Sequence, residues 1–135
     1  MTTTLDTLNT KEDFHIDENN IEGELCKAGH LLSLYGTLAA EVKLESAKRK
    51  ESLERKMAEK ALNIRETTRN AGLKITEGGI KERILTDTEC QQAHNEYIEA
   101  EYQFQKTENL FRSMQRKVDC VRTLAYKQQT EIAKY

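Results

Sequence analysis

The residues best suited to chemistry are cations gathered in the middle of the chain. The segment Lys43–Lys74 contains ten of the 21 Lys and Arg residues but only five Glu, so it carries +5 in a chain of net charge −2. Many of these cations are adjacent in sequence, whereas helical ion pairing would interleave the two signs. Clustered Lys and Arg suit phosphate groups. The candidate nucleic-acid-binding residues are Lys48, Arg49, Lys50, Arg55, Lys56, Lys60, Arg65 and Arg69.

Histidine and cysteine, which often form reactive sites, are poorly arranged for chemistry in this chain. The three histidines are His15, His30 and His94. No second His stands at ligand spacing from any of them, and neither His30 nor His94 has a Glu three residues before it, so a metal site of the Glu-x-x-His kind is not expected. The three cysteines are Cys26, Cys90 and Cys120. Without a CxxC pair they predict neither a disulfide framework nor a zinc site, and each is expected to be a small buried side chain.

The remaining candidates for chemistry are a glycine pair and the aromatic residues. Gly78-Gly79 lacks the Lys and Ser or Thr of a phosphate loop, and the chain shows no nucleophile–base arrangement. We therefore expect no enzymatic activity and no cofactor. Three aromatic residues at core spacing are expected to pack inside: Tyr97, Phe104 and Phe111. Tyr102 and Tyr126 lie off that spacing, and base stacking by either remains open.

The composition favours long helices in a single domain. Aromatic residues make up 6% of the 135 residues, Pro and Trp are absent, and a third of the residues are charged. Because an apolar content of 37% is low for a monomeric globule, part of the burial is expected between subunits. No stretch has the roughly 20 apolar residues of a membrane span. No apolar leader follows the first residue either, so a cytoplasmic protein is expected.

Capping signals divide the chain into a tail and three helices. We expect a flexible tail over 1–16 and one helical domain over 17–135, with helices over 17–71, 77–85 and 87–134. Asp17 is the expected first N-cap, and Gly72 is the expected left-handed residue at the end of that helix. Thr76 and Thr86 are the next expected N-caps, the latter in a capping box with Glu89.

Apolar residues recur every 3.5 residues in both long helices, which is typical of helices packed lengthwise on partners. The first ladder is Ile21, Leu25, Ala28, Leu32, Tyr35, Ala39 and Val42, resuming with Leu53, Met57, Ala61 and Ile64. The second is Cys90, Ala93, Tyr97, Ala100, Phe104, Thr107, Phe111, Met114, Val118, Val121, Ala125, Gln128, Ile132 and Tyr135. Regularly spaced glycines, Gly23, Gly29 and Gly36, indicate close approach of another helix.

These elements predict an all-α fold, a long antiparallel helical hairpin with a short connecting helix, assembled as a homo-oligomer. Two helices of about 50 residues would each span about 75 Å. Folding back sets the acidic Glu77–Glu101 stretch beside the basic run, so ion pairing within the hairpin is an alternative explanation of these cations. Arg49 stands on the ladder itself, where a subunit contact would prefer an apolar side chain.

The order of features resembles the UvsY-type recombination mediator family of tailed bacteriophages. Asp13-Phe14-His15-Ile16-Asp17 is similar to the D-x-x-I-D motif that opens the family before its long first helix. The basic centre KRKESLERK follows at 48–56, and Ile80-Lys81 through Leu85-Thr86-Asp87 leads into the final helix. The likeness covers most of the chain in layout and in scattered residues. One departure is that residues 64–70 replace a tyrosine- and glycine-containing stretch of the family.

The resemblance implies a ring of six to seven subunits that binds single-stranded DNA. It further implies partners, a RecA-like recombinase that is loaded onto DNA covered by single-strand-binding protein. A phage-encoded protein of this kind would act in the cytoplasm of the host cell. The family's basic central helix contributes to DNA contact, and its matching positions here are the eight candidate cations. The alternative hypothesis is an α-helical oligomeric scaffold or assembly chaperone without nucleic-acid binding.

Overall fold

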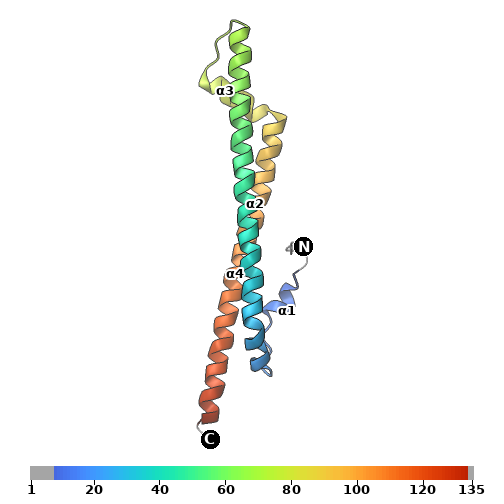
Figure 1. The fold of residues 1–135 in the computed structure, drawn as a ribbon, viewed down its shortest axis with the longest axis vertical. Coiled ribbons are helices and arrows are strands. Elements are labelled where there is room, and N and C mark those ends of the chain that lie inside the picture. The colour runs from blue at the N-terminus through green and yellow to red at the C-terminus, as the bar shows by residue number, and fades with distance from the viewer. Residues whose placement is uncertain (1–7, 134–135) are drawn as a thin grey trace. The chain divides into compact units, whose positions relative to one another are not determined.

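The structure is a computed structural model that describes residues 8–133. The described part contains four helices: α1 (Thr10–Phe14), α2 (Ile21–Asn70), α3 (Glu77–Thr86) and α4 (Thr88–Ala133). The long helices α2 and α4 pack antiparallel and are joined by α3 (Figure 1). This confirms the predicted all-α hairpin with a short connecting helix. None of the helices in residues 8–133 is long and apolar enough to cross a membrane.

The chain divides into two compact units. The chain up to Val42 together with the chain from Phe104 onward forms one, here called the terminal unit. Lys43–Gln103 forms the other, here called the central unit. The helices α2 and α4 contribute to both units, whereas α1 belongs to the terminal unit and α3 to the central unit. The basic run therefore lies in the central unit.

Large apolar side chains fill the core of the terminal unit. Its buried cluster consists of Ala28, Leu31, Tyr35, Met114 and Val118, from α2 and α4. A Cβ added at Gly36 would lie 3.0 Å from Cε2 of Phe111, so this glycine permits the close approach that its spacing predicted. Gly23 and Gly29 contact no other helix in this way. The 3.5-residue ladders are confirmed as core positions at Ile21, Ala28, Tyr35, Thr107, Met114, Val118 and Val121. The prediction was wrong at Leu25, Gln128 and Ile132, which are exposed.

The core of the central unit is smaller and is built around α3. Its buried cluster consists of Ile64, Ile80, Ile84 and Cys90, one or two from each of α2, α3 and α4. Ala61 and Ile75 pack against it. Leu53 and Ala93 are also buried, as their ladder positions predicted, whereas Met57 is exposed. The apolar part of this unit therefore gathers at the end where the chain turns back.

Two predicted helix starts were wrong by a few residues. The first long helix begins at Ile21 rather than after Asp17, because the Asn20 side chain accepts a hydrogen bond from the Gly23 amide at 3.1 Å. Asp17 instead accepts from the amide of Asn19 at 3.0 Å in a local turn. Of the two capping residues, Asp17 and Asn20, the one next to the apolar ladder caps the helix.

The last helix is capped by Asp87 and not by the predicted Thr86. The Asp87 carboxylate accepts from the Cys90 amide at 3.0 Å, while the Thr86 hydroxyl donates to carbonyls of the preceding turn at 3.2 Å. The reason is that α3 extends through Thr86, so Thr86 is the last residue of α3 and is not free to cap α4. The helix α4 starts at Thr88 accordingly.

The other two predicted caps are confirmed. Gly72 has φ of 73°, a left-handed conformation that glycine adopts without strain. The Leu73 amide donates to the Thr68 carbonyl and the Gly72 amide donates to that of Arg69, each at 3.0 Å, which is a Schellman ending. At α3, the Thr76 hydroxyl accepts from the Gly79 amide at 3.0 Å.

The segment expected to be a flexible tail contains a short helix. The helix α1 spans Thr10–Phe14 and is capped by Asn9. Its residues contact α2 and α4, as described below, so the predicted boundary at residue 16 does not separate a tail from the folded part. Residues 1–7 of the predicted tail lie outside the described residues, as do residues 134 and 135 at the end of the second ladder.

Candidate nucleic-acid interface

All eight candidate cations lie on α2, within the central unit. Successive residues of an α-helix are rotated by about 100°, so residues seven apart return to nearly the same side. Lys48, Arg55 and Arg69 are separated by seven and fourteen residues and therefore share one side of α2. Leu53 and Ile64, which face the core, lie on the other side. Lys48, Arg55 and Arg69 are here called the outer basic face, and all three are exposed.

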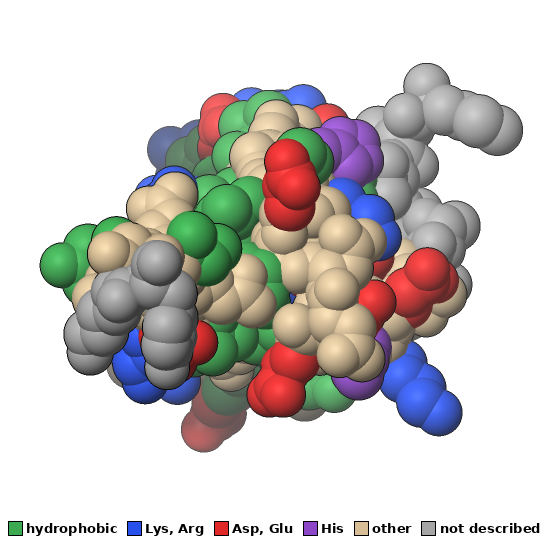
Figure 2. Space-filling model, turned by 90° about the horizontal axis from the view of Figure 1, so that it is seen from below, with side chains coloured by type: hydrophobic (Ala, Val, Ile, Leu, Met, Phe, Trp, Pro, Cys, Tyr) green, Lys and Arg blue, Asp and Glu red, His purple; other side chains and the backbone are tan. Residues whose placement is uncertain are grey.

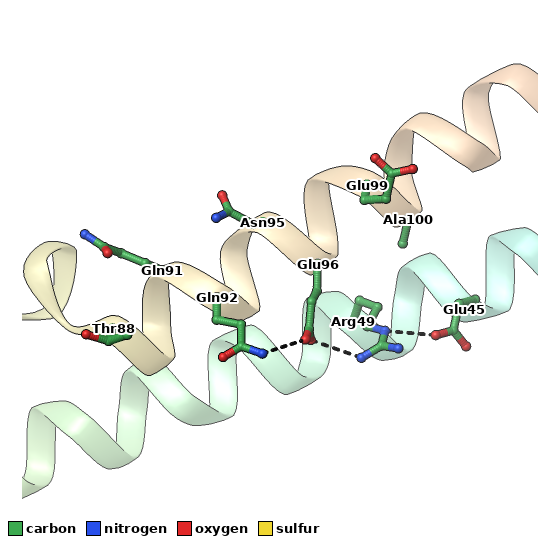
Figure 3. Close-up of a pocket in the computed structure, with 9 residues that line it drawn as sticks. All are labelled: Glu45, Arg49, Thr88, Gln91, Gln92, Asn95, Glu96, Glu99 and Ala100. Atoms are coloured by element: carbon green, nitrogen blue, oxygen red, sulfur yellow. Dashed lines mark hydrogen bonds and ion pairs between the residues drawn. The ribbon is translucent and has the colours of Figure 1, made fainter.

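Three of the other candidates form ion pairs that link α2 to another part of the central unit. Arg49 donates to Glu96 of α4 at 3.1 Å and to Glu45 of its own helix at 2.9 Å (Figure 3). Lys60 lies 3.2 Å from the Asp87 carboxylate before α4. Arg65 and Glu77 pair at 3.1 Å. These contacts show that the acidic stretch does face the basic run, as the charge pattern predicted.

The contacts of Arg49 explain its place on the apolar ladder. Its guanidinium extends to the side and bridges two carboxylates, and the Gln92 side chain donates to the second carboxylate oxygen of Glu96 at 3.4 Å. The hollow that these residues line has a volume of about 670 Å³. Its lining has three carboxylates, those of Glu45, Glu96 and Glu99, against one guanidinium. It is therefore unsuited to a phosphate group.

The two remaining candidates point to other sides of the helix. Lys50 follows Lys48 by two residues and is rotated by about 200° from it. Lys56 is half-buried and lines a hollow with Lys60 and Asp87. Within residues 8–133, neither Lys50 nor Lys56 forms an ion pair, and the same holds for Lys48 and Arg69. The eight candidates are thus distributed around α2. Three of them share one exposed side, and Arg65, four residues before Arg69, lies at the edge of that side and is paired with Glu77.

Arg55 is the member of the outer basic face that has a partner. It pairs with Glu51, one turn earlier, at 3.0 Å, and the two side chains are 66% and 70% exposed. A solvated pair of this kind contributes about 0 to 1 kcal/mol and is screened by salt. The guanidinium can therefore exchange Glu51 for another anion at small cost.

Comparison with protein-family models, curated proteins and solved structures finds no match.

The cysteines and histidines form no site in the described chain. Cys90 is buried, and burial together with the nearby Asp87 carboxylate raises the pKa of its thiol. Cys26 and Cys120 are exposed, so the expectation of burial was wrong for both; each lies on the side of its helix turned away from the core. All three histidines are exposed. Residues 8–133 contain no group of three His, Cys, Asp or Glu side chains that could hold a metal ion.

The pKa of Asp87 reflects its role as a cap and ion-pair partner. The Cys90 amide that it accepts from and the ammonium of Lys60 lower the pKa of this carboxyl below its usual range. The carboxylate is thus ionised at neutral pH and continues to hold Lys60. This ion pair links Lys60 of α2 to the residue that caps α4.

Sequence reasoning missed a buried polar cluster in the terminal unit. Glu24 and Lys117 form a buried ion pair at 3.0 Å, and the Tyr35 hydroxyl donates to the Asp13 carboxylate at 2.8 Å. Burial raises the pKa of Glu24, but Lys117, the Asp17 amide and Lys27 together lower it below its ordinary value. The sequence signal was Lys117 directly before the ladder residue Val118, a charge at the edge of an apolar stripe.

Proposed function

We propose that this protein is a single-stranded-DNA-binding recombination mediator that helps to load a RecA-like recombinase onto DNA covered by single-strand-binding protein. The outer basic face of α2 is the DNA-contacting surface in this proposal. The observation that carries it is the alignment of three exposed cations, Lys48, Arg55 and Arg69, on the side of α2 away from the core. Cations in this arrangement can meet phosphates without disturbing the packing of the hairpin.

The spacing of these cations suits a flexible polyanion. Seven residues of α-helix rise by about 10.5 Å, so Lys48 and Arg55 would contact phosphates that are not immediate neighbours. A single strand can adjust its backbone to this spacing because it is not held in a duplex. A homo-oligomer would present the face in several copies and raise the local concentration of binding sites along one strand.

A salt titration tests the DNA-binding part of the proposal. Fluorescence polarisation of a labelled oligonucleotide is measured at several salt concentrations for the wild type and for Lys48→Gln/Arg55→Gln/Arg69→Gln. Each phosphate contact on a single strand contributes about 0.7 to the slope of log affinity against log salt, so the triple variant should lose a slope of about 2. The wild type should bind at low salt, and an unchanged slope in the variant would remove this face from the site.

The matched control changes three exposed cations of the same unit that lie off the outer basic face. Lys43→Gln/Lys74→Gln/Lys81→Gln alters the net charge equally, and these lysines form no ion pair among residues 8–133. The control should keep most of the wild-type slope. Equal losses in both variants would mean that general charge, and not this face, attracts the DNA.

Loading is tested separately from binding. The rate at which a RecA-like recombinase assembles on DNA covered by single-strand-binding protein is followed by its DNA-dependent ATP hydrolysis, with and without the protein. The wild type should shorten the lag, and the triple variant should not. A protein that binds DNA and leaves the lag unchanged would be a DNA-binding protein but not a mediator.

An α-helical oligomeric scaffold or assembly chaperone is the second candidate, and the ion pairs of the central unit favour it. Arg49, Lys60 and Arg65 all contact acids of neighbouring elements, which explains part of the basic run without a ligand. Apolar side chains also lie at the surface, among charged and neutral polar groups, in the view from below (Figure 2). An oligomer in light scattering that binds no oligonucleotide at low salt would establish this candidate.

A further inference from the structure

Residues 8–17, here called the strap, include α1 and lie against α2 and α4 of the terminal unit. None of the residues of α1 is buried. Leu8 and Phe14 are half-buried and pack on the cluster that contains Tyr35 and Met114. An isolated helix of five residues is unstable in water because nucleation costs more than one turn of hydrogen bonds returns. The strap is therefore held in place by the surface on which it lies.

That surface recognises the side chains of two adjacent strap residues. The Tyr35 hydroxyl, on a fully buried residue, donates to Asp13 Oδ2 at 2.8 Å. The ring of Phe14 meets the ring of Tyr35 edge to face, with 5.4 Å between the centroids and 68° between the planes. Tyr35 thus contacts both the carboxylate of Asp13 and the aromatic ring of the next residue, Phe14.

The same surface also holds the strap's backbone at two points. Lys117 Nζ donates to the Asp13 carbonyl. It also lies 3.0 Å from Glu24 Oε2, where the two groups form an ion pair but no hydrogen bond. Glu24 Oε1 accepts from the Asp17 amide at 3.5 Å. The Lys117 and Glu24 side chains are only 7% and 8% exposed. One buried charged pair therefore supplies a donor and an acceptor for a bound peptide backbone.

We propose that this surface is a peptide-binding site, which the strap occupies within its own chain and which binds the strap of a second copy when its own strap opens. The site would recognise an Asp residue followed directly by Phe, with a backbone amide donor three residues after the Phe. The strap of a second copy meets every one of these requirements, since it has the same sequence. The site is independent of the outer basic face and does not rest on DNA binding.

The strap opens as a unit because its contacts belong to one site. Segments with few buried apolar contacts open at lower free energy than the core of a protein. No side chain of α1 is buried, whereas the core on which it lies includes fully buried residues. Opening the strap therefore leaves the α2–α4 pairing of the terminal unit in place and frees Tyr35, Lys117 and Glu24 to bind another segment.

A competition experiment with the full chain tests this site. The probe is a fluorescently labelled synthetic peptide with the sequence of residues 8–17. It should bind the Phe14→Ala chain at least about tenfold more tightly than the wild type, because the variant's own strap competes less well. A peptide carrying the same Phe14→Ala change is the control and should not bind. Equal binding of the peptide to wild type and variant, or no binding to either, would overturn the proposal.

A second pair of measurements separates the site from the folding of the variants. Far-UV circular dichroism should show unchanged helicity in Phe14→Ala, and Asp13→Ala serves as the alternative opened variant if it does not. Adding Tyr35→Phe removes only the hydroxyl that Asp13 accepts from, and it should weaken peptide binding by about tenfold. In the wild type, amides of residues 10–17 should exchange hydrogen together and faster than those near Met114. Exchange as slow as that of Met114 would contradict a separable strap.

Discussion

The two units use charged residues in opposite ways. In the terminal unit, Lys117 and Glu24 form a pair that is more than nine-tenths buried and is surrounded by backbone partners. In the central unit, the Arg49 side chain is 45% exposed, and its pairs with Glu45 and Glu96 are open to solvent. Removing one member of a buried pair strands a charge, whereas a solvated pair exchanges partners readily. The charged pair of the terminal unit is therefore part of its core, whereas the pairs of Arg49 lie at the surface of the central unit.

The apolar core is also larger and more deeply buried in the terminal unit than in the central unit. The fully buried large side chains, Tyr35, Met114, Val118, Val121 and Thr107, all belong to the terminal unit. The central unit relies on a smaller cluster of Ile and Cys around α3. Because burial of large side chains is the main source of stability, the terminal unit should contribute more of it.

The largest effect is expected from the buried ion pair. Lys117→Met should lower the free energy of unfolding by about 3–5 kcal/mol because it leaves Glu24 buried without a counter-charge. Urea unfolding followed by circular dichroism measures the change. The double variant Glu24→Gln/Lys117→Met removes both charges and should recover part of the loss. A loss below 1 kcal/mol for the single variant would show that this pair is not buried in solution.

A methionine in each unit provides the next comparison. Met114→Ala should lower the free energy of unfolding by about 2–5 kcal/mol, since the side chain is fully buried in the core of the terminal unit. Met57→Ala makes the same chemical change in the central unit, where the residue is 39% exposed, and should cost below about 1 kcal/mol. Similar losses at both positions would contradict the burial of Met114 and the exposure of Met57.

High pH should weaken the terminal unit through Tyr35. Burial and the Asp13 carboxylate raise the pKa of this phenol well above its ordinary value. Because the folded pKa is the higher one, the associated stability is complete below about pH 10, the ordinary pKa of tyrosine, and is lost as the pH rises above it. Unfolding free energies measured at increasing pH should fall less steeply for Tyr35→Phe than for the wild type. Parallel profiles would argue against the buried contact.

A smaller effect is expected at the central ion pair. Arg49→Gln should lower the free energy of unfolding by below about 1 kcal/mol, because both acidic partners remain solvated when the guanidinium is removed. The same urea titration measures it, with Lys50→Gln as the control that removes an exposed cation having no ion pair among the described residues. A loss comparable to that of Lys117→Met would erase the difference between the units.

The hairpin was predictable because its signals are local and repeated. The ladders in both long helices, the Thr76 cap and the left-handed Gly72 all follow from residue type and spacing. The misplaced starts at Asp17 and Thr86 arose where two capping residues stand within three positions of each other. Local sequence does not decide between such neighbours, because the choice depends on where the preceding element ends.

The site was predictable only as a segment. Seven-residue spacing relates Lys48, Arg55 and Arg69, but the side of α2 that faces α4 is fixed by partners such as Glu96, which lies 47 residues away from Arg49. The strap could not be predicted because its contacts also join residues far apart in sequence, 22 positions between Asp13 and Tyr35 and 104 between Asp13 and Lys117. Five residues also show no periodicity that would mark them as an amphipathic helix.

The role of the outer basic face is tested by comparing two triple variants within one basic run. Lys48→Gln/Arg55→Gln/Arg69→Gln should flatten the salt dependence of oligonucleotide binding, by a slope of about 2, and leave the free energy of unfolding nearly unchanged. Arg49→Gln/Lys60→Gln/Arg65→Gln removes the same charge from the same helix and should do the reverse, lowering stability while keeping most of the slope. Equal slopes for the two variants would contradict the claim that the outer basic face binds DNA.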